Sequence, residues 1–405
     1  VNFAKAFMKR SNYKKLSIIL TGTVIVCCIF ISVYHKFVSN RPNIILITVD
    51  ALRADHLGCY GYKLNTSPNL DRFAKEATLF TQAITQGTTT AMAFPSLQTS
   101  TYPRTHGVYR MGHKLNNTVT TLAQMLKKNN YTTAAIVTWN IRELIPGLNR
   151  GFDFIADVRF DRKADKITKM AIAYLEKNQH SKFFIWLHYF DTHAPYAPPP
   201  PYNRMFINDL DLGRRYVNID YSVLYPGDMQ KFMPKDKKNI LDVDYYISQY
   251  DGEIGFADEQ IGILLRRIKE MKLDEKSILI ITADHGEVLD EHRDCLFGHG
   301  TFYDQVLRVP LLIKYKNIIP AAVIINQQVQ CIDIVPTILD LLHIPKNRGM
   351  QGKSLLPLIY GKSNNLSLDA FSESLNRSDN KSTEECVRAD GWELIYTKME
   401  PTRTK

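Results

Sequence analysis

Cysteine is scarce in this chain, and so are several other features that mark specialised classes of protein. Six cysteines among 405 residues are too few for a scaffold built on disulfides. There is no internal repeat and no long low-complexity run. Hydrophobic residues make up 45% of the chain and charged residues 23%, which excludes a disordered or collagen-like chain. We therefore expect a globular protein, long enough for one large domain.

Acidic residues are absent from the first 40 positions, whereas six basic residues lie there. These are Lys5, Lys9, Arg10, Lys14, Lys15 and Lys36. Taking those six from the 51 basic residues leaves 45 against 41 acidic ones, so most of the net charge of +10 belongs to the N-terminal segment. Because the rest of the chain has no basic stripe, we expect it not to bind nucleic acid.

Charge of either sign is missing from residues 16–34, LSIILTGTVIVCCIFISVY. As a helix this stretch is about 28 Å long, enough to cross the hydrocarbon core of a membrane. We predict a single-pass anchor here, preceded by a basic cytoplasmic tail over residues 1–15; a cleaved signal peptide is the alternative. Because the positive charges precede the span, the positive-inside rule places the rest of the chain outside the cytoplasm.

From residue 42 onward, short apolar segments alternate with helical ones. The expected strands cover 43–49, 132–138, 182–189, 277–283 and 309–315. These segments are rich in β-branched residues, which is typical of strands buried on both faces. Helices are expected from Ser67-Pro68, around Leu122 to Leu126, and over 254–271. The pattern predicts an α/β fold with a mostly parallel central sheet and helices on both faces.

The domain organisation follows from the same pattern. We expect a catalytic domain over 42–361, interrupted by an insertion near 200–245 in which no motif is readable. Residues 362–385 are polar, which favours an exposed loop. With the residues after them, to 405, they form a small C-terminal subdomain.

Three of the expected strands end at a carboxylate. Asp50, Asp191 and Asp284 follow the strands 43–49, 182–189 and 277–283. In an open parallel sheet the ligand binds at the carboxyl ends of the strands, so three acids there favour a metal or an ester site. Capping of the following helix is the simpler interpretation for any one of them.

Histidines accompany these acids. His285 comes directly after Asp284, His193 lies two residues after Asp191, and His299 stands in the segment FGHGTFYD. Imidazole is both a ligand for divalent cations and a proton-transfer group. We therefore favour a functional interpretation for all three over a structural one.

Together these segments resemble the sulfatase family of the alkaline-phosphatase superfamily. The matching stretches run in the order of the family: NIILITVDALRADHLGCYGY, FPSLQTSTYPRTHGVY, NRGFDF, WLHYFDTHAPYAPP, ITADHGEVLDEH, FGHGTFYDQVLRVPLLIKY and CIDIVPTILDLLHIPKNRGMQGKSLLPLIYG. The resemblance implies hydrolysis or transfer at a sulfate or phosphate ester with a divalent cation. It also implies that Asp50 and Asp284 bind the cation, and that His193 and His299 contact the ester oxygens or the leaving group.

The chain departs from the family pattern at three places. Ala51 stands where a second metal-binding Asp is frequent, and His285 stands where Asn is common in calcium enzymes. Aligning on the family's Cys/Ser-x-Pro-x-Arg pattern at Phe94-Pro95-Ser96 puts Ala93 at the nucleophile, and alanine cannot attack. Thr90, three residues earlier, is our alternative nucleophile at the start of a helix. Simple helix capping by this threonine stays open.

The expected ligands are Asp50, Asp284, His285 and the Thr90 oxygen, a set of four that suits zinc or manganese better than calcium, although calcium stays open. We favour one ion. If Asp191, His193 and His299 also converge, a second ion fits beside it.

Three hypotheses about function follow. The first is a membrane-anchored, extracytoplasmic, metal-dependent hydrolase of sulfate esters. The second is a phosphodiesterase or phosphoryl-group transferase acting on a lipid or glycan, and the third is a binding protein that has lost its nucleophile. The partners expected are a sulfated or phosphorylated glycan or lipid and the membrane; the oligomeric state is left open.

Overall fold

The computed structural model describes residues 41–158, 163–207, 243–292, 295–362, 369–375, 383–389 and 391–397. The predicted anchor and the basic tail before it lie outside these ranges, as does most of the predicted insertion. Within the described ranges, none of the helices is both long and apolar enough to span a bilayer.

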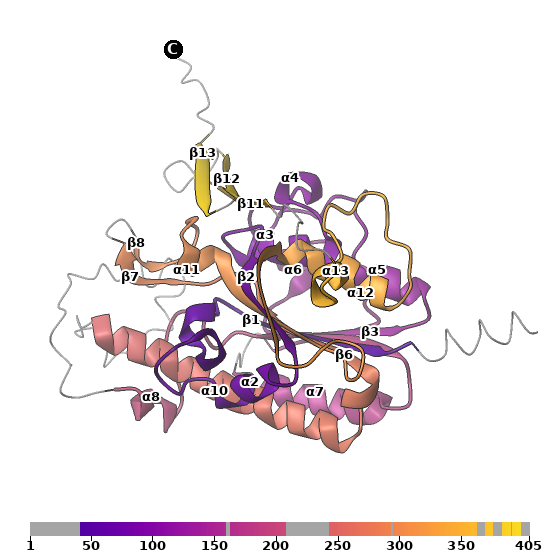
Figure 1. The fold of residues 1–405 in the computed structure, drawn as a ribbon, viewed down its shortest axis with the longest axis horizontal. Helices are drawn as coiled ribbons and strands as arrows, with labels where there is room; N and C mark the ends of the chain where they lie inside the picture. Colours follow the sequence, from indigo (N-terminus) through magenta and orange to yellow (C-terminus); the bar gives the residue numbers. More distant parts are fainter. Residues whose placement is uncertain are drawn as a thin grey trace, which may run out of the picture. The chain divides into compact units, whose positions relative to one another are not determined.

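A central sheet of eight strands carries the fold (Figure 1). Its spatial order is β10-β2-β9-β6-β1-β5-β3-β4, and the pairing is parallel except where β9 meets β2 and β6. The strands are β1 (Asn43–Val49), β2 (Thr78–Ile84), β3 (Thr132–Val137), β4 (Phe154–Asp157), β5 (Phe183–Tyr189), β6 (Ser277–Ala283), β9 (Arg308–Lys314) and β10 (Val323–Gln330). The predicted α/β class with a mostly parallel sheet is therefore confirmed.

Helices cover both faces of this sheet. Figure 1 shows α2 (Pro68–Ala74), α7 (Ala164–Asn178) and α10 (Val243–Glu270) on one face. The other face carries α3 (Thr90–Thr99), α5 (Leu122–Lys128) and α12 (Ile334–Leu341). Shorter helices are α4 (Pro103–His106), α6 (Ile141–Leu144), α8 (Tyr202–Met205), α11 (Asp304–Leu307) and α13 (Leu356–Ile359).

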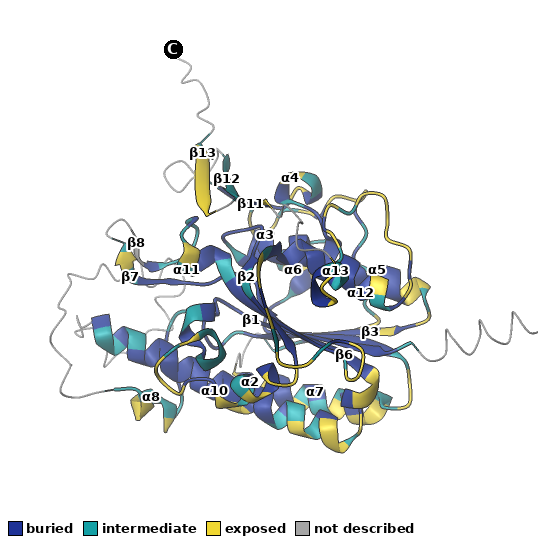
Figure 2. Cartoon of the chain, viewed as in Figure 1, coloured by how far each residue is buried: buried dark blue, intermediate teal, exposed yellow. Residues whose placement is uncertain are grey.

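The core lies between these layers. Every residue of the three central strands β1, β5 and β6 is buried, and Figure 2 shows exposed residues on α7 and α10, which cover one face of the sheet. Removing this apolar surface from water stabilises the fold by about 25 cal/mol per Å². Strands buried on both faces hold their ends in fixed positions, so side chains that directly follow β1 and β6 are placed with little freedom.

Two smaller sheets complete the structure. A hairpin is formed by β7 (Val288–His292) and β8 (Cys295–Gly298), and an antiparallel sheet by β11 (Ala370–Leu375), β12 (Thr383–Ala389) and β13 (Trp392–Thr397). The expectation of an exposed loop over 362–385 is wrong for β11, because Ser372, Glu373 and Ser374 are buried. Their polar groups bond to the main domain: Ser372 donates to the carbonyl of Thr85, and the Ser374 and Thr88 hydroxyls are 2.7 Å apart.

Candidate active site

The carboxyl ends of β1 and β6 bring the predicted metal ligands together. The two strands are parallel neighbours with Val49 opposite Ala283, so the residues that follow them emerge side by side. The Oδ1 atom of Asp284 accepts hydrogen bonds from the amides of Ala51 (3.2 Å) and His285 (2.9 Å). These two bonds fix the carboxylate and leave its Oδ2 atom directed at the site.

Three ligand atoms of Asp50, Asp284 and His285 lie within 4.8 Å of one another. The His285 Nε2 atom is 3.7 Å from Asp50 Oδ1 and 3.5 Å from Asp284 Oδ2. The other ring nitrogen, Nδ1, is 2.8 Å from the carbonyl oxygen of Gly286. Because a carbonyl oxygen only accepts, Nδ1 carries the proton, and the lone pair of Nε2 faces the two carboxylates.

The Thr90 hydroxyl oxygen is a fourth candidate ligand atom. Thr90 is the first residue of α3, and its Oγ1 atom lies 3.1 Å from the Nε2 atom of His285. Ala93 lies within this helix, and the hydroxyl at the N-terminus of the helix belongs to Thr90, three residues before the position that the alignment gave to the nucleophile. The helix dipole favours negative charge at this end.

A divalent cation fits this set of side chains. Asp50 Oδ1 and Asp284 Oδ2 are buried and accept no hydrogen bond. Burial and the neighbouring Asp284 carboxylate raise the pKa of Asp50 to about 7. Two buried carboxylates are costly unless a cation neutralises them. Two carboxylate oxygens, one imidazole nitrogen and one hydroxyl match zinc or manganese better than calcium, which needs six to eight oxygens.

The two other predicted histidines, His193 and His299, lie next to this cluster. The ring centroid of His299 is 4.3 Å from that of His285 and 5.3 Å from that of His193. His193, His299 and Thr90 line one cleft of about 410 Å³. All three predicted catalytic side chains thus face the same space, next to the candidate ion site.

The hydrogen bonds of these two histidines give them different properties. His193 Nδ1 donates to the carbonyl of Ala194 at 2.7 Å, which leaves a lone pair on Nε2, and burial lowers the pKa of this histidine. His299 Nδ1 is 3.1 Å from Glu287 Oε1. Burial raises the pKa of Glu287 to about 7. When Glu287 is ionised, its carboxylate next to Nδ1 favours the protonated form of His299, whereas His193 Nδ1 faces a neutral carbonyl.

Asp191 does not belong to the cluster. Its Oδ1 atom accepts a hydrogen bond of 3.0 Å from the amide of Ala164, the first residue of α7. The simpler interpretation, a carboxylate at a helix start, therefore applies to this acid. Within the described part of the chain, Asp50, Asp284 and His285 are the group with metal-binding spacing, and Asp191, His193 and His299 form no second one.

His188 is a site residue that the sequence analysis missed. It lies inside β5, fully buried, with its Nε2 atom 3.3 Å from Asp50 Oδ2 and its Nδ1 atom 3.2 Å from Thr48 Oγ1. Thr48 in turn accepts from the indole of Trp186 at 2.9 Å. We expect this contact with His188 to orient Asp50. The signal in the sequence was a histidine in an otherwise apolar strand, in register with Thr48 of β1.

Replacing His188 is expected to weaken metal binding while leaving the ligands in place. We expect His188→Phe to lower the affinity for zinc or manganese about 10- to 100-fold, as for other partners of metal ligands. His188→Gln keeps a donor on the same side and should lose much less. Metal titration of the purified protein measures both values, and equal affinities for wild type and both variants would contradict the role.

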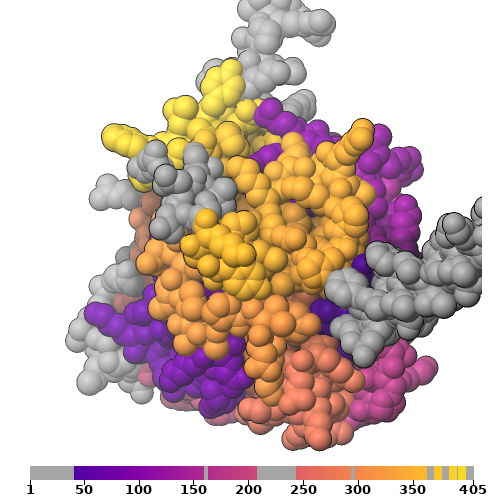
Figure 3. Space-filling view, turned by 45° about the vertical axis from the view of Figure 1, so that its right-hand side comes forward, coloured from indigo at the N-terminus to yellow at the C-terminus, as the bar shows by residue number. Residues whose placement is uncertain are grey.

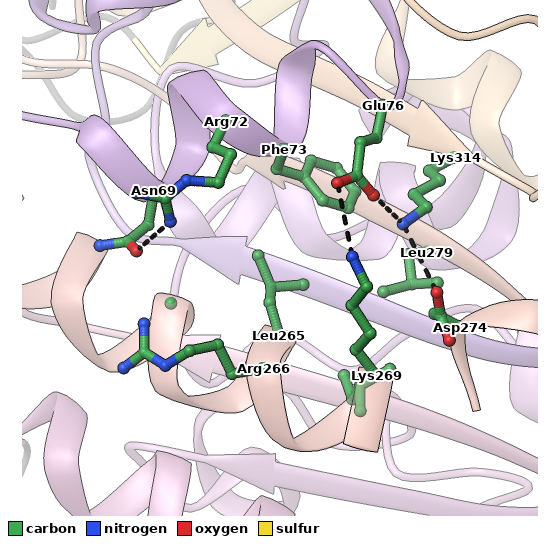
Figure 4. Close-up of a pocket in the computed structure, with 12 residues that line it drawn as sticks. Asn69, Arg72, Phe73, Glu76, Leu265, Arg266, Lys269, Asp274, Leu279 and Lys314 are labelled. Atoms are coloured by element: carbon green, nitrogen blue, oxygen red, sulfur yellow. Dashed lines mark hydrogen bonds and ion pairs between the residues drawn. The ribbon is translucent and has the colours of Figure 1, made fainter. Parts of the chain in front are cut away.

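A second cavity, of about 130 Å³, lies between α2 and α10 (Figure 4). It is near the amino end of β6, whereas the candidate active site is at the carboxyl end of this strand. Leu279, near the start of β6, and Lys314, the last residue of β9, border it and are paired in register. Lys314 Nζ lies 2.6 Å from Glu76 and 4.0 Å from Asp274, and the basic side chains that line the cavity outnumber these two acids. These ion pairs join the end of β9 to the segments that follow α2 and α10, and none of their residues lines the cleft of the candidate catalytic groups.

Comparison with protein families gives two matches. Residues 42–344 match the family described as Sulfatase. Residues 291–402 match the family described as N-sulphoglucosamine sulphohydrolase, C-terminal. The second match covers β11 to β13, the small sheet that packs against the cleft.

Two curated relatives illustrate the range of similarity. An ulvan-active sulfatase of Formosa agariphila is 25% identical over 384 residues, which cover 87% of this chain and 72% of that protein. Iduronate 2-sulfatase of Homo sapiens is 26% identical over 332 residues, which cover 68% of this chain and 60% of that protein.

Solved structures show the same fold. One, determined with its substrate D-glucosamine-2-N,6-O-disulfate, has a TM-score of 0.73 at 20% identity and covers 88% of both chains. A phosphonate monoester hydrolase from Silicibacter pomeroyi also has a TM-score of 0.73, at 19% identity, covering 88% of this chain and 87% of that one. At these identities the likeness concerns the fold.

Proposed function

The chain belongs to the sulfatase family of the alkaline-phosphatase superfamily, and from this premise we propose that it hydrolyses a sulfate ester carried by an anionic glycan. One observation carries the proposal: the Thr90 hydroxyl begins α3, lies 3.1 Å from His285 Nε2 and opens into the cleft. Relatives named for iduronate sulfate and for glucosamine disulfate support a sugar as the carrier.

In this proposal the Thr90 hydroxyl gives up its proton to solvent, and the resulting alkoxide oxygen attacks the sulfur of the ester. A new oxygen–sulfur bond forms on Thr90 while the bond from sulfur to the leaving sugar oxygen breaks. A protonated His299, held by Glu287, donates its Nε2 proton to that oxygen. Water then attacks the sulfur of the threonine ester, the bond from sulfur to the Thr90 oxygen breaks to return the alkoxide, and the lone pair of His193 Nε2 accepts a proton from the attacking water.

The ion held by Asp50, Asp284, His285 and Thr90 would supply positive charge that stabilises the Thr90 alkoxide and the ester oxygens. The N-terminus of α3 adds a partial positive charge at the same place. The amides of Thr90 and Ala91 are in the first turn of the helix, where no intrahelical partner is available to them. They can donate to a tetrahedral oxyanion in the cleft.

A second candidate reaction is phosphoryl transfer or phosphodiester hydrolysis on a lipid or glycan. A threonine nucleophile favours this reaction, because a phosphorylated threonine can transfer its phosphoryl group either to water or to another hydroxyl by in-line displacement. The similarity of fold to a phosphonate monoester hydrolase is consistent with a site that accepts phosphorus esters. Binding without catalysis remains the third hypothesis.

The placement of the domain is a further part of the proposal. Residues 16–34 are proposed to anchor the chain, with residues 1–15 in the cytoplasm and the catalytic domain outside. The proposed catalytic domain is 42–361, followed by the C-terminal subdomain. Protease digestion of intact cells tests this placement, because only an extracytoplasmic domain is cleaved without permeabilisation.

A panel of esters separates the three hypotheses. The protein is purified, freed of metal, and supplied with zinc, manganese or calcium, and turnover is measured with 4-nitrophenyl sulfate, 4-nitrophenyl phosphate and bis(4-nitrophenyl) phosphate. We expect turnover of the sulfate ester with zinc or manganese. Preference for the phosphodiester supports the second reaction. A folded protein that turns over none of the three supports the binding protein.

A further inference from the structure

We infer that Arg110, at the mouth of the cleft, binds a second anionic group on the substrate, so that the preferred substrate is a sugar carrying a carboxylate or sulfate besides the ester that is cleaved. The inference rests on the proposed function and names its substrate class. Three features carry it: the charge of the cleft, the position of the nearest acid, and the way in which the arginine is held.

The walls of the cleft contain cationic and neutral side chains but no acid. Besides Thr90 and the two histidines, the described residues lining it are Thr89, Ala91, Met92, Tyr109, Arg110, Met111, Gly300, Ser374 and Leu375. Arg110 is exposed and forms no ion pair with any acid in the described part of the chain. A substrate with a single negative charge needs only the candidate ion and the start of α3, which leaves this arginine uncompensated.

The carboxylate next to this wall is already engaged. Glu373 of β11 is buried, and it accepts a hydrogen bond of 2.7 Å from the Tyr109 hydroxyl and one of 3.2 Å from Arg104 Nε. Arg104 also pairs with Glu385. Figure 3 shows the yellow C-terminal sheet beside the violet segment that contains these residues. The carboxylates near this wall therefore pair with Arg104 and Tyr109, and neither of them pairs with Arg110.

The guanidinium of Arg110 is held on one side only. Its Nε atom donates to His113 Nε2 at 2.8 Å, and its Nη atoms make no hydrogen bond to a described residue. The loop itself is fixed, because the amide of Gly112 donates to Leu144 of α6 and that of Leu115 to Pro146. An oriented guanidinium with two free nitrogens matches a planar carboxylate or a sulfate by paired hydrogen bonds.

The test compares two substrates and two variants. The substrates are a sulfated uronic acid and the sulfated neutral sugar of the same configuration, which lacks the carboxylate. We expect Arg110→Gln to lower kcat/KM roughly 10- to 100-fold for the uronic acid, as for a charge-assisted hydrogen bond. The loss should appear in KM with kcat nearly unchanged, because the contact is made equally in the ground and transition states.

Arg348→Gln is the matched control, because Arg348 is also exposed but lies on the loop after α12 and does not line the cleft. This substitution should leave kcat/KM unchanged for both sugars. Arg110→Lys should retain part of the kcat/KM that Arg110→Gln loses, since lysine keeps the positive charge but lacks the paired N–H donors of the guanidinium. Equal losses of Arg110→Gln on both sugars, or no loss on either, would overturn the inference.

The inference and the proposed function fail in different ways. If wild type turns over the sulfated neutral sugar but Arg110→Gln behaves as wild type on both sugars, the function stands and the inference fails. If wild type turns over no ester, calorimetric titration of the two sugars into wild type and Arg110→Gln decides the inference. Tighter binding of the uronic acid that is lost in the variant supports it, and equal binding of both sugars overturns it.

Discussion

Thr90→Val is expected to lower kcat/KM at least about 10³-fold for whichever ester the protein turns over, because valine keeps the shape of threonine but has no oxygen to attack with. The Thr90 hydroxyl contacts His285 Nε2 and the Asp284 carboxylate, and losing a hydrogen bond costs about 0.5–1.5 kcal/mol, or about 1.5–3 kcal/mol where one partner is charged. The variant should therefore stay folded. Rates with the ester panel and thermal unfolding of both proteins provide the measurement.

Two neighbouring substitutions make this result specific. Thr89→Val changes the preceding residue, which also lines the cleft but forms no side-chain hydrogen bond with His285, and should retain most of the activity. Thr90→Ser keeps a hydroxyl and should keep activity within about 10-fold, since the nucleophilic group is unchanged. A Thr90→Val protein as active as Thr89→Val would show that a water molecule attacks the ester instead of this side chain.

The central strands could be predicted from the sequence because their burial leaves a clear signal. NIILITV and SILIITA are continuous apolar runs, and the structure has them as β1 and β6 with the predicted bounds. β2 and β10 were not predicted. Their sequences TLFTQAI and VIINQQVQ mix polar and apolar residues, because β10 is an edge strand and β2 lies next to it. Here strand pairing, rather than local hydrophobicity, decides the structure.

Helix α10 shows the same limit. The apolar stripe predicted a helix over 254–271, whereas the structure has it from Val243 to Glu270. Its first part contains buried polar residues such as Gln249 and Asp251. Asp251 accepts from the Tyr62 hydroxyl and lies 2.7 Å from His56 Nδ1, so it holds the loop after β1. A polar residue buried by a distant partner looks like a solvent-facing residue in the sequence.

The candidate ion site could be found because its side chains directly follow strands. Asp50, Asp284 and His285 need only two adjacent parallel strands to meet, and the apolar runs before them predicted those strands. His188 and Glu287 could not be assigned in this way. Their roles depend on which atoms they touch, Asp50 Oδ2 and His299 Nδ1, and no spacing in the sequence gives such contacts.

Asp284→Asn is expected to abolish retention of the metal ion. The amide keeps the shape of the carboxylate, and its oxygen can still accept from the amides of Ala51 and His285, so the ends of β1 and β6 stay in place. What is lost is one of two buried negative charges that favour a cation. Elemental analysis after gel filtration should find about one ion per wild-type chain and almost none in the variant.

Thermal unfolding provides an independent measure of the same loss. An ion at 100 times its Kd stabilises the wild-type fold by about 2.7 kcal/mol, so chelation should lower its Tm, and the Tm of Asp284→Asn should not respond to chelator. Asp191→Asn is the matched control: this carboxylate is also buried after a central strand, but it is bonded to the amide of Ala164 rather than directed at the ion site. It should keep its ion even if the start of α7 is weakened. An Asp284→Asn protein that retains metal as Asp191→Asn does would mean that the buried acids after β1 and β6 hold no cation, and the attack by Thr90 would then lack the charge that activates it.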